Sequence, residues 1–260
     1  MGAIGKFRFT RKDVLYIAIL LVINLFRFKI WKFKKKKKKI DRPIIHLYAV
    51  CRNEEQIIPF FMEYYRQFVS EFFIYDNYSD DNTETLLKEY PNVHIKKFDT
   101  KGTLNDVINK DIKNNAWKQS IGKADWIITC DMDEFLYHKN GVPDYLQNTK
   151  ATIFKTTGID MYSESFPKRD KSLFEQVNRG VYSTKYSKPM LFDPYKIIKT
   201  NYIIGAHLAD PEGFVIWGPD DFSLLHFKNL GLDYIMKRVQ SYRKRFSDIN
   251  IKNDWGFEYF

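Results

Sequence analysis

Three carboxylates follow an apolar run in ADWIITCDMDEF (124–135), and this motif is the strongest chemical signal in the sequence. Asp131 and Asp133 share one side of an extended chain, so both can reach a single hard divalent cation. Such an ion bridges a diphosphate and neutralises the charge that develops as the diphosphate leaves. Acids also crowd strand-to-loop transitions for structural reasons, but three of them directly after apolar residues need a compensating charge. The motif therefore predicts a metal site at Asp131 and Asp133.

Two other apolar runs end in polar side chains. IYDNYSDDNT carries Asp76 at a place suited to contact a base or a ribose. AVCRNEEQ delivers Arg52, Asn53 and Glu54 to the same edge, where Arg52 can contact a phosphate or a carboxylate. An acid such as Glu54 can also simply favour the N-terminus of the helix that follows. We expect these segments to bind the nucleotide part of a ligand.

Later in the chain, one histidine and three aspartates complete the candidate chemistry. His226 ends the apolar run SLLHF and could be a third metal ligand, a phosphate contact or a structural residue. A displacement in which a hydroxyl group attacks needs a carboxylate that accepts the hydroxyl's proton. Asp220 and Asp221 in GPDDF, and Asp160 in TTGIDMY, are the candidates for this base, although each can equally be a turn residue. Asp221 is the preferred one.

The elements that must position these residues alternate along the chain. Apolar runs predict strands at 44–50, 71–76, 93–98 and 125–131, and helical spacing predicts helices at 54–68, 83–90 and 104–121. This alternation is typical of a mostly parallel α/β sheet with helices on both faces. Ligands of such sheets bind beyond the carboxyl ends of the strands, where the acidic motif falls. After Phe135 the pattern changes to mixed strands and loops, and a clear helix returns only at 232–246.

The blocks AVCRNEEQIIPFFMEYYRQF, FFIYDNYSDDNT and ADWIITCDMDEFL together resemble successive blocks of the family 2-like glycosyltransferases of the GT-A fold. The most similar branch has an acidic motif that reads DxDEF and is related to glycosyltransferase family 92. The resemblance covers residues 44–138 well and continues more weakly through SKPMLFDP and LLHFKNLGLDYIMKR. It implies a GT-A fold and a transferase that uses a nucleotide-sugar donor, with UDP-sugar expected, and a glycan or other hydroxyl acceptor.

The resemblance also implies roles for individual residues. Asp131 and Asp133 would bind Mn²⁺ or Mg²⁺ on the diphosphate of the donor, and Asp76 would contact the nucleoside. Residues from Val50 to Arg52 would pack on the base. The common family 2 pattern has Pro and Tyr where this chain has Val50 and Arg52, which puts these base contacts in doubt. No Glu-Asp pair stands where family 2 keeps its catalytic base.

The N-terminal segment carries almost all of the net charge. Residues 1–41 hold 13 Lys and Arg against two Asp, a charge of +11, which leaves 29 basic against 30 acidic residues in 42–260. A neutral body argues against a nucleic-acid partner. An apolar run (14–26) precedes six consecutive lysines (34–39), a pattern that predicts an apolar helix attached to an anionic membrane surface. We therefore expect a membrane anchor with a polybasic linker at 1–41 and one catalytic domain at 42–260, with spanning and interfacial anchors both open.

The charges beside the apolar run also bear on topology. Four basic residues precede it and nine follow it, so the positive-inside rule predicts a cytosolic catalytic domain, with the ER or Golgi lumen as the alternative. The two cysteines, Cys51 and Cys130, are expected to be unpaired, which suits a reducing compartment. Two other functions stay open at this point: a haloacid-dehalogenase-like phosphatase, and a non-catalytic membrane-surface module.

Overall fold

A central sheet carries the first half of the chain in this computed structural model, which describes residues 42–256. Its spatial strand order is β3-β2-β1-β4-β9-β6. The strands are β1 (Ile45–Cys51), β2 (Glu71–Asp76), β3 (Val93–Lys97), β4 (Trp126–Asp131), β6 (Ile153–Phe154) and β9 (Leu191–Phe192). β1 pairs in parallel with both β2 and β4, and β2 pairs in parallel with β3, whereas β9 is antiparallel to its neighbours β4 and β6. The predicted α/β sheet is thus confirmed as a mixed sheet.

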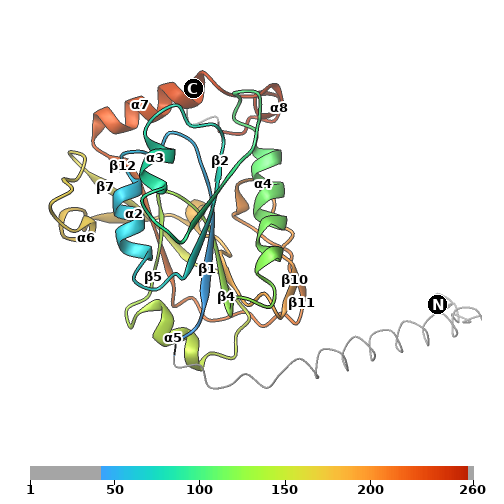
Figure 1. Ribbon diagram of the computed structural model, residues 1–260. Coiled ribbons are helices and arrows are strands. Elements are labelled where there is room, and N and C mark those ends of the chain that lie inside the picture. The colour runs from blue at the N-terminus through green and yellow to red at the C-terminus, as the bar shows by residue number, and fades with distance from the viewer. Residues whose placement is uncertain (1–41, 257–260) are drawn as a thin grey trace, which may run out of the picture. The chain divides into compact units, whose positions relative to one another are not determined.

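Helices cover both faces of this sheet because its strands are apolar on both sides. α2 (Ile58–Tyr65) and α3 (Thr83–Leu87) lie on one face, and α4 (Asp106–Asn115) lies on the other (Figure 1). Leu47 of β1 belongs to the same buried cluster as the side chains of α2, while the adjacent Tyr48 belongs to the cluster on the α4 side. Alternate residues of a strand point to opposite faces, so one strand supplies two cores.

The expected long helix at 104–121 is divided in two. Asn105 begins α4, because its side chain accepts hydrogen bonds from the backbone N–H groups of Val107 and Ile108. A 3₁₀ helix, η1 (Ala116–Ser120), follows directly and buries Trp117 against the sheet. The predicted helix at 54–68 shortens to α2, with Pro59 in its first turn, where a missing N–H costs nothing.

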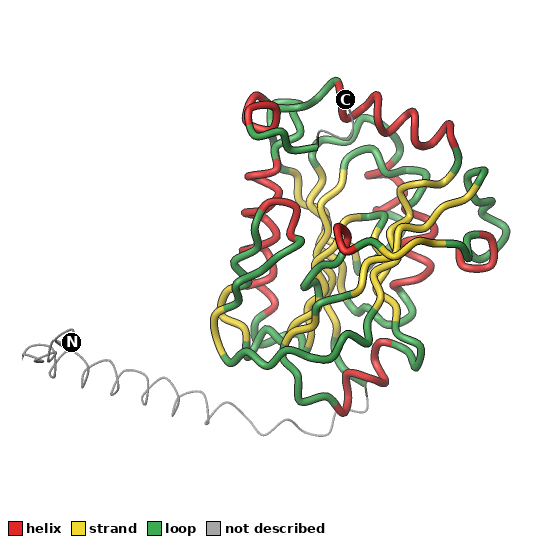
Figure 2. Tube along the Cα trace, turned by 180° about the vertical axis from the view of Figure 1, so that it is seen from behind, coloured by secondary structure: helices red, strands yellow, loops and turns green. Residues whose placement is uncertain are grey.

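A second sheet lies beside the first and was not predicted as such (Figure 2). Its strands, in spatial order, are β5 (Glu134–Tyr137), β12 (Ser223–Leu230), β7 (Thr157–Ser163) and β8 (Gly180–Tyr182). β12 is antiparallel to β5 and parallel to β7. Because β4 ends at Asp131 and β5 begins at Glu134, the chain passes from one sheet to the other inside the acidic motif.

The remaining elements complete the body. α7 (Leu232–Arg243) follows β12 and lies beyond the carboxyl ends of the central strands (Figure 1). The others are α5 (Val142–Asn148), α6 (Leu173–Gln176), the hairpin of β10 (Ile197–Lys199) with β11 (Glu212–Gly213), the short 3₁₀ helices η2 (Thr184–Tyr186) and η3 (Ile204–Ala206), and α8 (Asp248–Lys252). Within 42–256, no helix is both long and apolar enough to cross a membrane. The predicted apolar helix at the N-terminus lies outside the described residues, and the division at residue 41 stays a prediction.

Candidate active site

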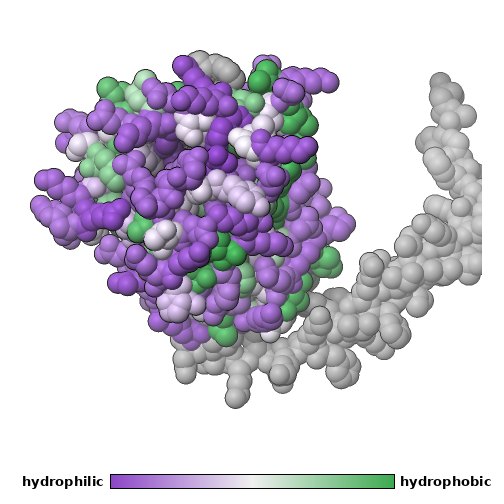
Figure 3. Space-filling model, turned by 45° about the horizontal axis from the view of Figure 1, so that its top comes forward, coloured by the Kyte–Doolittle hydropathy of each residue, from purple (hydrophilic) through white to green (hydrophobic). Residues whose placement is uncertain are grey.

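A cavity of about 430 Å³ opens at the carboxyl ends of β1 and β4. Residues from β1, α4, β4, β12, α7 and the last described turn of the chain line it. Figure 3 brings this end of the molecule forward and shows a mainly hydrophilic surface. The cavity lies where the sequence predicted a ligand site, because the carboxyl ends of parallel strands meet at one edge of a sheet.

Asp131, the last residue of β4, is held between two lysines. Its Oδ1 is 2.6 Å from Lys113 Nζ on α4, and its Oδ2 is 2.9 Å from Lys188 Nζ. Burial raises the pKa of Asp131, but the charges of the two lysines outweigh this effect and hold that pKa below its ordinary value. Lys188 is buried and also pairs with Glu134. Two carboxylates therefore share one buried ammonium group.

Asp133 contacts a different pair of cationic side chains. Its Oδ2 lies 2.8 Å from Arg238 Nη2 on α7 and 3.5 Å from His226 Nε2 on β12. Burial would raise the pKa of Asp133, and the charges of Arg238 and His226 bring it below the ordinary range instead. The backbone contributes too, since Phe227 N–H donates to the carbonyl of Asp133 at 2.8 Å. The second aspartate is thereby fixed to β12 as well as to α7.

Arg238 connects three parts of the site. Its Nη1 donates to Glu54 Oε2 at 2.8 Å and to Tyr234 Oη at 3.0 Å, and its Nη2 donates to Tyr242 Oη at 2.9 Å as well as to Asp133. Burial raises the pKa of Glu54 to about 7, even though the charge of Arg238 opposes the shift. Glu54 is thus a partly buried carboxyl group whose pKa lies well above the ordinary value of a glutamate.

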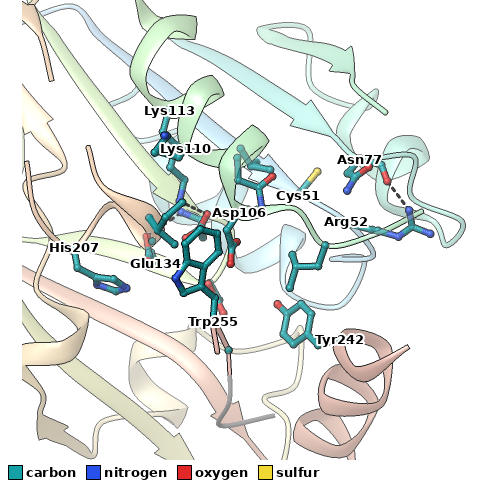
Figure 4. Close-up of a pocket in the computed structure, with 18 of the residues that line it drawn as sticks. Cys51, Arg52, Asn77, Asp106, Lys110, Lys113, Glu134, His207, Tyr242 and Trp255 are labelled. Carbon is teal, nitrogen blue, oxygen red and sulfur yellow. Dashed lines mark hydrogen bonds and ion pairs between the residues drawn. The ribbon is translucent and has the colours of Figure 1, made fainter. Parts of the chain in front are cut away.

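The residues predicted to bind the nucleotide are only partly brought together. Val50, Arg52 and Glu54 line the cavity. Asn53 does not line the cavity, and its side chain donates to Asp80 Oδ1. Figure 4 shows Arg52 with its Nη1 donating to the carbonyl of Asn77, which also lines the cavity.

Asp76, predicted to contact the nucleoside, is fully buried and does not line the cavity. Its Oδ1 accepts a hydrogen bond from the hydroxyl of Ser79, and its Oδ2 lies 3.2 Å from Lys97 Nζ. The Asp76 carboxylate therefore stabilises the conformation of the loop after β2. Its neighbour Asn77 takes the place in the cavity wall that was expected for Asp76.

Neither Asp220 nor Asp221, the predicted bases, reaches the cavity. Both are exposed, and Asp221 accepts a hydrogen bond from Tyr145 Oη. They precede β12, whose fourth residue is His226, so strand geometry puts Asp221 roughly 16 Å along the strand from the acidic motif. A base must come within hydrogen-bond reach of its proton, and this placement does not support either residue in that role. Asp160, the third candidate, pairs in register with His226 but does not line the cavity.

Within residues 42–256, no group of three or more His, Cys, Asp or Glu side chains is arranged to hold a metal ion. Asp133 and His226 are a pair whose spacing suits one, although Asp133 Oδ2 also accepts a hydrogen bond from Arg238 Nη2 at 2.8 Å. Two ligands that each lie about 2.1 Å from one ion are about 3 to 3.5 Å apart. The atoms Asp133 Oδ2 and His226 Nε2 have this spacing at 3.5 Å. Mg²⁺ is typically held by one or two carboxylates plus substrate phosphates, so a bound diphosphate would complete the set. Asp131 is engaged by its lysines, and its predicted metal contact stays a prediction.

Several cavity residues were not found from the sequence. Lys113, Lys188 and Arg238 surround the acidic motif, and Asp106 and Trp255 also line the cavity (Figure 4). The family resemblance offered a signal for two of them. Lys188 lies in the block SKPMLFDP and Arg238 in the block LLHFKNLGLDYIMKR, and both blocks support the resemblance. Nothing in the spacing of either block indicated that its cation would meet the acids.

Residues 48–256 match the sequence model of glycosyltransferase family 92. No curated protein matches the sequence. Among solved structures, a mannosyltransferase from Pyrobaculum calidifontis in complex with GDP-Man and Mn²⁺ is 12% identical at a TM-score of 0.33, covering 55% of this chain and 43% of that one. GalNAc-T7 with UDP, GalNAc and Mn²⁺ is 10% identical at a TM-score of 0.39, covering 84% of this chain and 55% of that one. The chain thus spans less than two thirds of the length of either structure, and at these TM-scores only the family match bears on function.

Proposed function

Because the chain belongs to glycosyltransferase family 92, we propose that its cavity binds a nucleotide-sugar donor and transfers the sugar to a glycan or other hydroxyl acceptor. One observation carries the proposal. Arg52 Nε and Arg245 Nη1 are buried polar atoms without a hydrogen-bond partner among residues 42–256, and both side chains line the cavity. Buried donors are nearly always paired, and guanidinium groups suit phosphate oxygens, so a diphosphate is the partner that the cavity lacks. Family membership also argues against the phosphatase alternative.

The donor's diphosphate would lie among the charges of the acidic motif. Asp133 and His226 would hold a Mn²⁺ or Mg²⁺ ion, which supplies positive charge against the departing diphosphate when it is bound. Lys113 and Lys188 add fixed positive charge on the side of Asp131, already oriented before the donor arrives. UDP is the proposed nucleotide, and the parallel strands β3-β2-β1-β4 are the arrangement expected of a GT-A donor half.

Asp106 replaces Asp221 as the proposed base for an inverting transfer. It lines the cavity in the first turn of α4, and Asn250 Nδ2 donates to its Oδ2 at 2.8 Å. Burial raises the pKa of Asp106, although the hydrogen bond from Asn250 lowers it in part. The raised pKa makes the carboxylate a better proton acceptor. In the step, the acceptor oxygen bonds to the anomeric carbon and its proton passes to Asp106. The bond from that carbon to the diphosphate breaks, and the nucleoside diphosphate keeps the electron pair.

The place of the enzyme in the cell is proposed from the sequence alone. Residues 1–41 would attach the body to a membrane, spanning it or lying in its interface, through the apolar run and the lysines. The charge asymmetry favours a cytosolic catalytic domain over a lumenal one. Protease treatment of sealed microsomes tests this: a protected catalytic domain would place it in the lumen.

A panel of nucleotide sugars with Mn²⁺ tests the function. We expect slow hydrolysis of one donor class, measured as release of the nucleoside diphosphate, and little release in excess chelator. Arg52→Met and Arg245→Met should raise the KM for that donor, with Arg169→Met, an exposed residue outside the cavity, as the matched control. Failure of every nucleotide sugar to bind or react would reject the proposal.

A further inference from the structure

One imidazole ring lies between two carboxylates at the junction of β5, β12 and β7. His226 Nε2 is 3.5 Å from Asp133 Oδ2, and on the other side of the ring His226 Nδ1 is 4.0 Å from Asp160 Oδ1. The backbone sets this arrangement, since His226 pairs in register with Glu134 on one neighbouring strand and with Asp160 on the other. The three side chains therefore form a row across the second sheet.

Two atoms of this row face each other at 4.0 Å. His226 Nδ1 and Asp160 Oδ1 are both buried, and neither has a hydrogen-bond partner within the part of the chain that the structure describes. One can be a donor and the other is an acceptor, so each is the natural partner of the other. The distance of 4.0 Å is about 1 Å longer than a hydrogen bond, a gap that small rotations of the two side chains would close.

The positions of the two residues relative to the cavity separate their roles. His226 lines the cavity, whereas Asp160 does not. Asp160 is therefore badly placed to contact an acceptor hydroxyl, but well placed to act on the histidine from behind. The ring is also packed, because the ring of Tyr186 lies 4.5 Å from it, centroid to centroid.

We infer that Asp160 is a positioning residue that accepts the Nδ1–H of His226 and so turns the Nε2 lone pair toward Asp133. In the neutral ring one nitrogen carries the proton, and the hydrogen bond of that nitrogen selects which one. A lone pair that faces a carboxylate needs a cation between the two, and metal-binding histidines typically donate their second nitrogen to a carboxylate. The inference rests on the proposed function, because the cation would be the donor-bound Mn²⁺ or Mg²⁺.

The first test reads the ring itself in the metal-free, full-length protein. Long-range ¹H–¹⁵N spectra report the tautomer of each histidine, and the signals that vanish in His226→Ala belong to His226. We expect the Nδ1–H form in the wild type and its loss in Asp160→Ala. An Nε2–H form in the wild type, or an unchanged ring in the variant, would overturn the inference without touching the glycosyltransferase proposal.

The second test measures the affinity for Mn²⁺ alone, from the electron paramagnetic resonance signal of the free ion. Asp160→Ala should bind Mn²⁺ roughly 10- to 100-fold more weakly than the wild type. Asp170→Ala, an exposed aspartate on the turn after β7, is the matched control and should bind as the wild type does.

A double variant separates positioning from a general structural effect. Asp160→Ala in the His226→Ala background should cause no further loss of Mn²⁺ affinity, because the residue acts only through the ring. The same loss in both backgrounds would contradict the inference. If Asp160→Ala does not fold, Asp160→Asn keeps the side-chain volume, and its amide nitrogen can donate to Nδ1 and select the wrong tautomer. A wild type that binds no Mn²⁺ would remove the metal from the proposed function and leave the ring spectrum to decide the role of Asp160.

Discussion

At the scale of single residues, the site is a set of buried charges that compensate one another. Asp131 and Asp133 do not face open solvent as a free pair of acids, because lysines hold the first and Arg238 with His226 hold the second. Breaking one buried pair leaves an uncompensated charge, which typically costs about 3 to 5 kcal/mol of stability. Substitutions that keep the shape but change the charge therefore give the clearest results.

Asp133→Asn should abolish sugar transfer while the protein stays folded. The amide keeps the size of the side chain and can still accept from Arg238, but it removes the negative charge that would hold the ion. We expect at least a roughly 100-fold loss in kcat and a loss of Mn²⁺ binding, measured by turnover and by metal titration. Full activity of the wild type in excess chelator would contradict the metal role.

Asp106→Asn and Asp221→Asn separate the two candidates for the base. Asp106 lines the cavity, so its variant should lose roughly 100- to 10,000-fold in kcat while donor and metal affinity stay near normal. Asp221 lies outside the cavity and holds Tyr145, so its variant should keep turnover. The reverse result, a dead Asp221→Asn and an active Asp106→Asn, would restore the assignment made from the sequence.

Glu54→Gln should change how stability depends on pH. Burial raises the pKa of Glu54 from 4.5 to about 7, so the native state keeps a proton that the unfolded chain has already released. The contribution of Glu54 to stability is therefore full below about pH 4.5 and is lost as the pH rises to about 7.

Chemical denaturation across this window measures the effect as a difference between wild type and variant. The lost contribution is on the order of 3 kcal/mol, and Glu54→Gln should not show it. The wild type must be compared with the variant because His207 also titrates in this range. Burial lowers the pKa of His207 to about 4, so its contribution to stability rises with pH while that of Glu54 falls. Glu55→Gln, next in the chain, is the control, and parallel curves for wild type and Glu54→Gln would refute the prediction.

At the scale of elements, the Arg238 side chain links α7 to the acidic site, while Tyr234 packs the same helix on the core. Arg238 is the contact of this helix with both Glu54 and Asp133, and Tyr234 and Tyr242 lie on either side of it at one turn's distance. The stability of α7 therefore depends on the charges of Glu54 and Asp133. Loss of the guanidinium should loosen the whole element.

Arg238→Met should lower stability by about 3 to 5 kcal/mol, because the buried Asp133 loses its counter-charge and Glu54 loses its hydrogen-bond donor. It should also speed hydrogen exchange of the amides in α7 more than those in β1. Lys237→Met, an exposed neighbour on the same helix, is the matched control and should change neither. Equal protection of α7 in the wild type and in Arg238→Met would show that packing alone holds the helix.

The sequence predicted elements where local pattern and tertiary contact agree. β1, β2 and β4 are apolar runs buried on both faces, and their bounds fall within one residue of the expected ones. The second sheet was harder, because TGIDMYS (157–163) is a half-exposed strand without alternation and β8 has only three residues. Such strands form because neighbours far along the chain pair with them.

The same limit explains which site residues could be predicted. Asp133 and His226 end or interrupt apolar runs, and such breaks are visible in the sequence. The partners of the acids are not, since Lys188 lies 57 residues from Asp131 and Arg238 lies 105 residues from Asp133. Only the fold decides which of many lysines and arginines meets a given acid.

At the scale of the whole molecule, the proposed function divides between a strongly basic part and a nearly neutral one. Residues 1–41 carry +11 and the remaining chain carries 29 basic against 30 acidic residues. Chemistry belongs to the second part, since the cavity is built within 42–256. Attachment to an anionic surface is proposed for the first.

Deletion of residues 1–41 should give a folded protein that still hydrolyses its donor but no longer binds anionic vesicles. Each basic residue near such a surface contributes about 1 kcal/mol, so the loss of binding should be nearly complete. Vesicle co-sedimentation and donor hydrolysis measure the two properties separately, with neutral vesicles as the control. An insoluble product would mean that the segment packs on the catalytic domain.

The passage of the chain from one sheet to the other between Asp131 and Glu134 has a practical consequence for engineering. Only two residues join the end of β4 to the start of β5, so the junction has no slack to absorb a change in how the sheets dock. A chimera that exchanges β7, β8 and β12 for those of a relative must therefore keep 131–137 uncut and place its first breakpoint after β5. Insertions tolerated in the surface turns would, at this junction, separate the two carboxylates from each other.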